Sequence, residues 1–391
     1  MFISGRHLCF LAALSAQMVV ALAQAEGLEG ETPSVSLEVA EVRFGVVEPP
    51  VVAQKDITLR FPTTRGDTTP MPLECSGLAW LGDRLLLSSD QHEHSLFTCK
   101  VDLQTMHIDD PQQHIVILNE QDLLMDAESI ALRHHLDNSW TAYVTCSLSN
   151  DPAGQRLPKR QHMARFRFSD PTNFLENRPI VLDASQVRTY LDEVHFEAIG
   201  VKPYRTYYAN ADGKDKNTYR WGDVEGVTLT YDGQRMVCGM RNPLYGGQAL
   251  VFIISNVDWA FQKRNPSMLE VTDLFTLDLG GRGISGMDWD HVTGGYLITA
   301  AKSNGPWMDR DQPFPPTFLD SALFWWSGRK DDKPILFARM PDMTIEGVCR
   351  LGMERYIAIV SDEGDISESR TERQSVVTIL DFTGLNLRSS P

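Results

Sequence analysis

The sequence predicts an all-β protein built as a β-propeller, and three observations support this prediction. Short apolar runs alternate with Gly, Asp, Asn and Pro along the chain, as in strands joined by tight turns. Helical periodicity is scarce, and residues 184–193 form the best short helical candidate. An internal repeat begins at Ser76, Glu128, Glu225, Ser285 and Glu346.

Each repeat consists of a small or acidic residue, Gly or Ser, an apolar strand, a polar turn and a second apolar strand. A unit of about 50 to 60 residues with four short strands is typical of a propeller blade. The interval from Glu128 to Glu225 is longer, so it holds either one blade with an insertion or two blades. A weak echo of the repeat at residues 195–200 favours six blades with one degenerate, and five blades are the alternative.

The two ends of the chain are expected to meet in one blade. Too few strands follow Glu346 to complete the last blade, so a strand from residues 36–61 should complete it and close the ring. We therefore expect residues 36–391 to form a single propeller domain, with an insertion at about residues 184–222. Residues 26–35 are polar and are expected to be a flexible segment.

Residues 1–25 have the pattern of a cleaved secretory signal. Arg6 precedes an apolar stretch, and Ala23-Gln24-Ala25 has the small-x-small form of a cleavage site. The mature protein is therefore expected to be periplasmic or secreted. No later run approaches the ~20 apolar residues that span a bilayer, so no transmembrane anchor is predicted.

Composition limits the partners. The chain has 36 Lys+Arg against 52 Asp+Glu and a net charge of -16, which disfavours nucleic acid as a ligand. A small molecule or a glycan is the expected ligand class, and the protein is expected to be a monomer. In an oxidising compartment Cys75 and Cys349 are predicted to form a disulfide between the first and last blades.

Four stretches carry a resemblance to a known family: residues 223–256, 282–290, 321–328 and 345–351. They resemble a bacterial β-propeller family of unknown function that is related to the esterase-like phytase propellers. The resemblance implies a propeller fold. It implies no established reaction, and ester or phosphate hydrolysis follows only by analogy with the phytase-like group.

The repeat predicts a functional site at one rim of the central channel, where the starts of inner strands meet the ends of second strands. Three repeat-start glutamates, Glu128, Glu225 and Glu346, would bind a divalent cation at near threefold positions. Oxygen ligands favour Ca²⁺ over Mg²⁺ here, and both over zinc. Arg241 and Lys302 would hold an anionic substrate group, with Asp362 beside the cation. The alternative is that the glutamates simply pair with Arg241 and Lys302.

Further side chains are candidates for contact with a substrate or partner. In the segment from Asp90 to His94, Asp90 would face the rim, and His92 and His94 share one side of an extended chain. Tyr207, Tyr208 and Asn242 are the other candidates. The alternatives are a solvated loop around His92 and a covering flap around the tyrosines.

Two functions are consistent with these patterns. The leading hypothesis is a divalent-cation-dependent hydrolase of ester, phosphate or lactone substrates at the channel mouth. The alternative is a non-catalytic binding propeller that recognises a glycan, peptide or protein.

Overall fold

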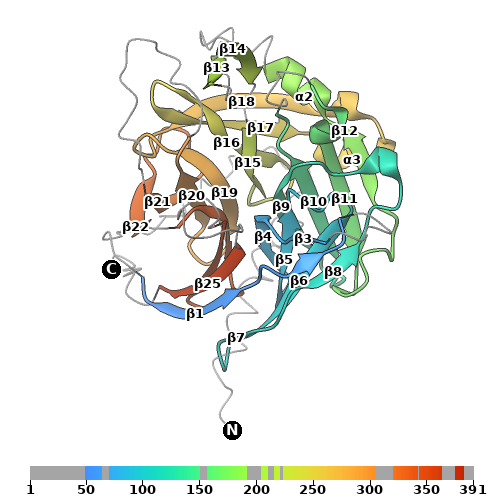
Figure 1. Ribbon diagram of the computed structural model, residues 1–391, viewed down its shortest axis with the longest axis vertical. Helices are drawn as coiled ribbons and strands as arrows, with labels where there is room; N and C mark the ends of the chain where they lie inside the picture. Colours follow the sequence, from blue (N-terminus) through green and yellow to red (C-terminus); the bar gives the residue numbers. More distant parts are fainter. Residues whose placement is uncertain are drawn as a thin grey trace, which may run out of the picture. The chain divides into compact units, whose positions relative to one another are not determined.

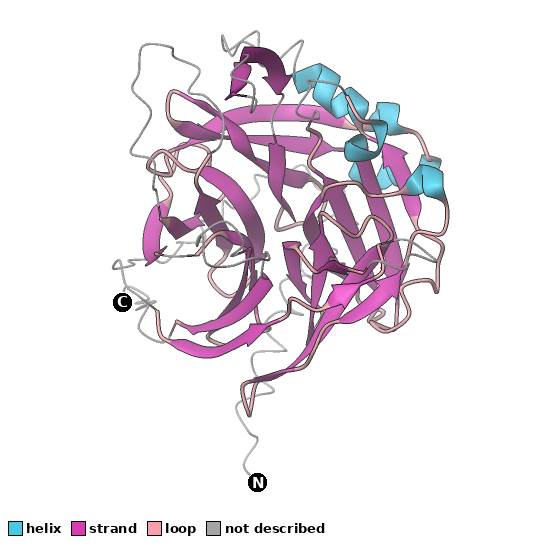
Figure 2. Ribbon diagram, viewed as in Figure 1, coloured by secondary structure: helices cyan, strands magenta, loops and turns pink. Residues whose placement is uncertain are grey.

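The computed structural model describes residues 49–63, 70–149, 156–191, 204–209, 215–220, 223–303, 320–341, 343–362 and 375–382. Within these residues strands dominate, and antiparallel sheets surround a central axis (Figures 1 and 2). Each of the five sheets with four or more strands is one blade. The predicted signal at residues 1–25 and the flexible segment 26–35 lie outside the described residues, as do residues 36–48.

Blades 1 to 3 occupy the first two thirds of the described chain. Blade 1 contains β4 (Cys75–Trp80), β5 (Arg84–Ser89), β6 (Ser95–Asp102), β7 (His107–Ile108) and β8 (Gln112–Ile115). Blade 2 contains β9 (Ala127–His134), β10 (Trp140–Cys146), β11 (His162–Phe168) and β12 (Ile180–Asp183). Blade 3 contains β15 (Asp223–Leu229), β16 (Met236–Tyr245), β17 (Gln248–Ser255) and β18 (Glu270–Leu277).

Blades 4 and 5 complete the ring. Blade 4 contains β19 (Gly283–Asp290), β20 (Gly295–Ala301), β21 (Ser321–Trp326) and β22 (Ile335–Met340). Blade 5 contains β23 (Ile345–Arg350), β24 (Tyr356–Asp362), β25 (Ser375–Asp381) and β1 (Val51–Asp56). Strand β1 runs antiparallel to β25, with Ala53 opposite Ile379 and Lys55 opposite Val377 (Figure 1). The predicted closure of the last blade by an N-terminal strand is therefore confirmed.

The smaller elements lie between or beside the blades. The helices α2 (Ser185–Tyr190) and α3 (Val257–Lys263) lie beside blades 2 and 3 (Figure 2). Short 3-10 helices are η1 (Glu120–Asp122), η2 (Pro158–Gln161) and η4 (Pro266–Met268). Strands β2 (Arg60–Phe61) and β3 (Met71–Pro72) pair, as do β13 (Tyr204–Ala209) and β14 (Asp215–Arg220). No helix in the described part of the chain is long and apolar enough to cross a membrane.

The described residues form five blades, so the preference for six was wrong and the alternative of five is confirmed. The inner strands β4, β9, β15, β19 and β23 contact one another in this order, and β23 packs against β4. The long interval between blades 2 and 3 holds α2 and the β13–β14 hairpin rather than a blade. Residues 195–200, whose echo of the repeat suggested a sixth blade, lie outside the described residues.

Close packing of the inner strands explains the Gly or Ser at the second position of each repeat. A Cβ on Gly286 would lie 2.8 Å from the Glu346 carbonyl oxygen and 2.9 Å from Gly347 Cα, on the neighbouring blade. Blade 2 has Ser129 instead, whose Oγ accepts a 2.8 Å hydrogen bond from the Val227 amide of blade 3. A larger side chain at these positions would push adjacent inner strands apart.

The predicted Cys75–Cys349 disulfide is not present: both thiols are free and buried. Cys75 is the first residue of β4, whereas Cys349 is the penultimate residue of β23. Cys75 lies one residue before its repeat start, Ser76, whereas Cys349 lies three residues after Glu346. Cys349 is therefore four residues further along its strand than Cys75, or roughly 13 Å. A disulfide requires Cα atoms within about 7 Å, so the two cysteines cannot be joined.

Candidate functional site

The first residue of every repeat lies in a β-bulge at the start of an inner strand. In blade 3, Val224 pairs with Met240 and Gly226 with Gly239, so Glu225 is an extra residue without a cross-strand partner. The same register shift occurs at Glu128, Ser285 and Glu346, and in blade 1 at Ser76 and Gly77. A bulge re-aims a side chain out of the strand's regular alternation. The repeat therefore encodes a ring of side chains that its bulges redirect.

Four of the five bulged starts contribute to one polar cavity of about 190 Å³, which we call the mouth cavity. Its carboxyl groups come from blades 1, 2, 3 and 5, and Arg241 of β16 is the basic side chain in its lining. The lining residues are Glu74, Cys75, Ser76, Asp90, Glu128, Glu225, Arg241, Thr344, Glu346 and Asp362. Six carboxyl groups thus face one guanidinium group.

Arg241 joins three blades across the cavity. Its Nη1 donates to Glu225 Oε2 at 2.9 Å and to both carboxylate oxygens of Glu346, at 3.3 and 3.2 Å. Its Nε donates to the backbone carbonyl of Lys302 at 3.1 Å. Burial opposes the charge of this side chain, but Glu225 and Glu346 outweigh burial and raise the pKa of Arg241. The guanidinium is therefore held by carboxylates rather than presented to an anion.

Glu128 is in a different environment. Burial and the nearby carboxylates of Asp126, Glu225 and Asp90 raise the pKa of Glu128 well above its ordinary value. Its carboxyl group makes no hydrogen bond or ion pair with the described residues. Burial also raises the pKa of Glu225, although Arg241 counteracts this effect. Of these two glutamates, Glu128 lacks a basic partner, so its protonated form is the more strongly favoured.

The predicted cation ligands Glu128, Glu225 and Glu346 do line one cavity, on blades 2, 3 and 5 rather than at threefold positions. The group between Glu225 and Glu346 is the Arg241 guanidinium. Among the described residues, no three His, Cys, Asp or Glu side chains are grouped so that they could hold a metal ion. The alternative that the glutamates pair with Arg241 and Lys302 holds in part: Glu225 and Glu346 pair with Arg241, whereas no hydrogen bond or ion pair among the described residues joins Glu128 to a basic side chain or a glutamate to the Lys302 side chain.

Lys302 and Asp362 differ in their positions. Asp362, at the end of β24, lines the mouth cavity as expected. The Lys302 side chain is exposed and is not part of that lining; only its backbone carbonyl contacts Arg241. Arg241 and Lys302, which were predicted to hold an anionic group together, therefore do not form such a clamp in this geometry.

Two of the proposed contact residues are buried elsewhere. His92 is 1% exposed, packs edge-on against Phe61 and Phe97, and contacts Ser89 Oγ through Nδ1 at 3.0 Å. Burial lowers its pKa, which favours the neutral imidazole. Asn242 is 2% exposed and donates to Asp223 Oδ2 at 2.8 Å. Neither is placed to touch a ligand, and His92 is not in a solvated loop either.

Asp90 lies in the mouth cavity, as predicted from its position after β5. Tyr207 and Tyr208 lie on β13, opposite Asn217 and Lys216 of β14. The side chains of this hairpin lie outside the description, so contact between these tyrosines and a partner stays a prediction.

Glu74 is the cavity residue that the sequence reasoning missed. It is 7% exposed, and its Oε2 accepts a 3.2 Å hydrogen bond from Gln91 Nε2. Blade 1 begins its repeat with Ser76, so it has no acidic residue at the bulge. A carboxylate two residues before the repeat start was the signal that could have identified Glu74.

No family model and no curated protein sequence matches the chain. Among solved structures, it is similar to a GH43 β-1,3-galactosidase with galactodeoxynojirimycin (TM-score 0.42, 10% identity, 84% of this chain and 94% of that chain). It is also similar to a protein of unknown function from Dyadobacter fermentans (TM-score 0.41, 9% identity, 85% and 99%). A third is the β-propeller domain of Cps50 from Myceliophteria thermophila (TM-score 0.35, 9% identity, 84% and 99%). These similarities concern the fold, and the phytase-like family stays a prediction.

Proposed function

We propose that the mouth cavity is a hydrolytic site in which Glu128 donates a proton to the leaving group of an uncharged or cationic substrate. The observation that carries the proposal is the contrast between Glu128, without a basic partner, and Glu346, held by Arg241. Acid and base catalysis by two carboxyl groups relies on such a difference between their environments, one without a basic partner and one held by a guanidinium.

In this account Glu128 protonates the oxygen of the bond that breaks. The carboxylate of Glu346 accepts a proton from the attacking water, and Arg241 keeps that carboxylate in place. Acetal bonds of glycosides require no more than such a pair, whereas ester hydrolysis also requires stabilisation of an oxyanion. A glycosidic bond is therefore the best match, and esters and lactones are secondary candidates.

The charge of the cavity narrows the substrate further. Six carboxyl groups surround the site, and Arg241 is already bound by two of them. A phosphate ester would meet like charge without a free clamp, so phosphate substrates are disfavoured. The predicted signal at residues 1–25 would place this site in the periplasm or outside the cell.

The test is a screen of aryl glycosides, aryl esters and lactones with the wild-type chain and with Glu128→Gln. Removing the general acid should lower kcat by about 10²-fold or more without lowering the melting temperature. Glu120→Gln, at an exposed position in η1 that lines neither described cavity, is the matched control and should keep full activity. Unchanged turnover in Glu128→Gln would refute the assignment.

We keep a divalent cation, Ca²⁺ before Mg²⁺, as a second proposal. The excess of carboxyl groups in the mouth cavity favours cation binding. The position of Arg241 argues against Glu225 and Glu346 as ligands. No three acidic side chains of the described residues are grouped as ligands, so an ion here would bind through fewer carboxyl groups, with water completing its coordination. If the proposal holds, EDTA should lower the melting temperature, calcium should restore it, and elemental analysis should find one stoichiometric ion. No metal and no EDTA effect would overturn it.

A further inference from the structure

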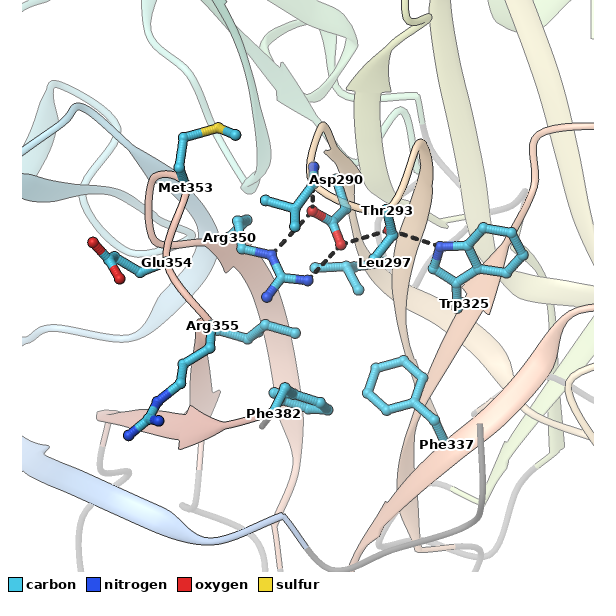
Figure 3. A pocket seen from close by; sticks show the side chains of 12 residues that line it. Asp290, Thr293, Leu297, Trp325, Phe337, Arg350, Met353, Glu354, Arg355 and Phe382 are labelled. Atoms are coloured by element: carbon cyan, nitrogen blue, oxygen red, sulfur yellow. Dashed lines mark hydrogen bonds and ion pairs between the residues drawn. The ribbon is translucent and has the colours of Figure 1, made fainter. Parts of the chain in front are cut away.

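A second cavity, of about 210 Å³, lies between blades 4 and 5, and we call it the lower cavity (Figure 3). The inner strands start at the mouth cavity, and the lower cavity is built from their other ends. Asp290 ends β19 and Arg350 ends β23, while Leu297 and Ile357 lie near the starts of β20 and β24. The two cavities therefore lie toward opposite ends of the inner strands.

The walls of the lower cavity are mainly apolar and aromatic. Trp325, Phe337 and Phe382 line it, and the rings of Phe337 and Phe382 meet edge to face with centroids 5.1 Å apart. The indole Nε1 of Trp325 donates to Thr293 Oγ1 at 2.9 Å, which fixes the ring. Aromatic walls in a fixed geometry suit a flat apolar ligand.

One polar group is held in this apolar setting. The Arg350 side chain is 6% exposed, and Asp290, with 0% exposure, binds its Nε at 3.0 Å and its Nη2 at 2.5 Å. Asp290 also accepts hydrogen bonds from Thr293 Oγ1 and the Val292 amide, at 2.7 and 3.0 Å. Nη1 of Arg350 makes no hydrogen bond to a described residue. In Figure 3 the guanidinium lies next to Asp290, and Phe382 and Phe337 are drawn below this pair.

We propose that the lower cavity binds a small uncharged aromatic molecule whose carbonyl oxygen accepts a hydrogen bond from Arg350 Nη1. Nη1 of Arg350 is not among the fully buried polar atoms that lack a partner, so a molecule in the cavity can reach it. A ligand carbonyl would replace water as the acceptor of this N–H group. The proposal does not depend on the hydrolytic site at the mouth cavity.

The charge balance specifies an uncharged ligand. Asp290 already neutralises Arg350, and Arg355 at the rim pairs with Asp381 at 3.1 Å. A ligand carboxylate would therefore lie close to Asp290 without a free cation to match it.

The volume of the lower cavity limits the size of the ligand. An apolar cavity of about 150 Å³ is enough for benzene, so about 210 Å³ accommodates one ring with a short carbonyl substituent.

The test is a titration with acetophenone, followed by the indole N–H resonance of Trp325 in ¹H–¹⁵N NMR spectra and assigned with Trp325→Phe. Saturable binding is expected with a Kd on the order of 1 mM. Ethylbenzene, which lacks the acceptor, should bind about fivefold or more weakly, and so should benzoate, which is charged. No shift with acetophenone, equal or tighter ethylbenzene binding, or tighter benzoate binding would each overturn the proposal.

A cavity-filling variant leaves the Arg350–Asp290 pair intact. Val292→Trp, from the turn at the rim, should abolish acetophenone binding, whereas Leu136→Trp, at a 97% exposed position on blade 2, should not. If Val292→Trp does not fold, Met353→Trp replaces it, because Met353 lines the rim and is 75% exposed. Binding that survives in a folded filled variant would place acetophenone elsewhere and refute the site.

Discussion

Arg241 is the basic side chain that compensates the charge of two buried carboxylates in the mouth cavity. It is 14% exposed and connects Glu225 of blade 3 with Glu346 of blade 5. Without it, two buried carboxylates would face each other and the remaining acidic groups of the cavity. A buried ion pair adds little net stability when intact, but removal of one partner leaves uncompensated charge.

Arg241→Met should therefore lower the free energy of unfolding by about 3 to 5 kcal/mol at neutral pH. Urea denaturation of the variant and the wild type measures this difference. Arg167→Met is the control, because Arg167 is 55% exposed and its 3.2 Å ion pair with Asp137 lies on the surface. The control should lose less than about 1 kcal/mol. Equal losses of unfolding free energy in the two variants would mean that the buried ion pairs of Arg241 matter no more for stability than a surface ion pair.

The raised pKa of Glu128 leads to a specific pH dependence of the free energy of unfolding. Its pKa in the folded protein is raised, so over the range between the unfolded and folded pKa values the native state holds more protons than the unfolded state. Stability from this group is therefore lost as pH rises above 4.5, the ordinary pKa of a glutamate side chain.

Glu128→Gln removes that loss. The melting temperature of the variant relative to the wild type should rise between pH 4 and pH 8, measured by calorimetry in matched buffers. A difference that stays constant across this range, or that falls, would contradict a raised pKa at Glu128.

At the scale of the strand, the two repeat positions have separate roles. The bulged first residue points its side chain out of the regular alternation, and the small second residue lets the next inner strand approach. The carboxyl groups converge because the bulges recur at the same height in neighbouring blades.

Gly286→Ala tests the second role. The added methyl group would lie 2.7 Å from Thr299 Oγ1 and against the backbone of β23, so stability should fall by about 2 to 3 kcal/mol. Gly246→Ala has open space but a φ of +58°, and should cost only about 1 kcal/mol through backbone strain. Chemical denaturation of both variants gives the comparison. A Gly286→Ala cost no greater than that of Gly246→Ala would refute the packing role.

At the scale of the whole propeller, closure depends on β1. The strand pairs with β25, and the core between blades 1 and 5 includes Ile57, just after β1, together with Cys349 and Val377. A chain that starts at residue 49 keeps β1, whereas one that starts at residue 57 leaves β25 as an open edge. The shorter chain should melt at a markedly lower temperature and be cleaved faster by protease. Indistinguishable behaviour of the two chains would refute closure by β1.

Much of this architecture could be predicted from the repeat. The repeat identified the propeller, and Glu128, Glu225 and Glu346 as residues of one rim, because bulge position and strand order are local properties of the sequence. The blade count was wrong because residues 195–200 imitate the repeat, while the number of blades depends on which inner strands pack around the axis.

Interactions across the channel were harder to predict. The alternatives included an Arg241 pair with the glutamates, but no local pattern shows that one guanidinium spans from β16 to blade 5. Cys349 was misplaced because a position four residues into a short strand was treated as its start. Glu74 was not predicted because it lies two residues before the start of its repeat. The lower cavity was not predicted because its walls come from the ends of several separate strands.

The surroundings of Glu128 in the mouth cavity raise its pKa, and the proposed function depends on this shift. The most direct measurement is ¹³C NMR titration of the glutamate side-chain carboxyl groups, with the Glu128 resonance assigned from its absence in Glu128→Gln. We predict a midpoint well above 4.5, the ordinary value from which the shift is raised. A midpoint at or below 4.5 would contradict the account and remove the proton donor from the proposed site.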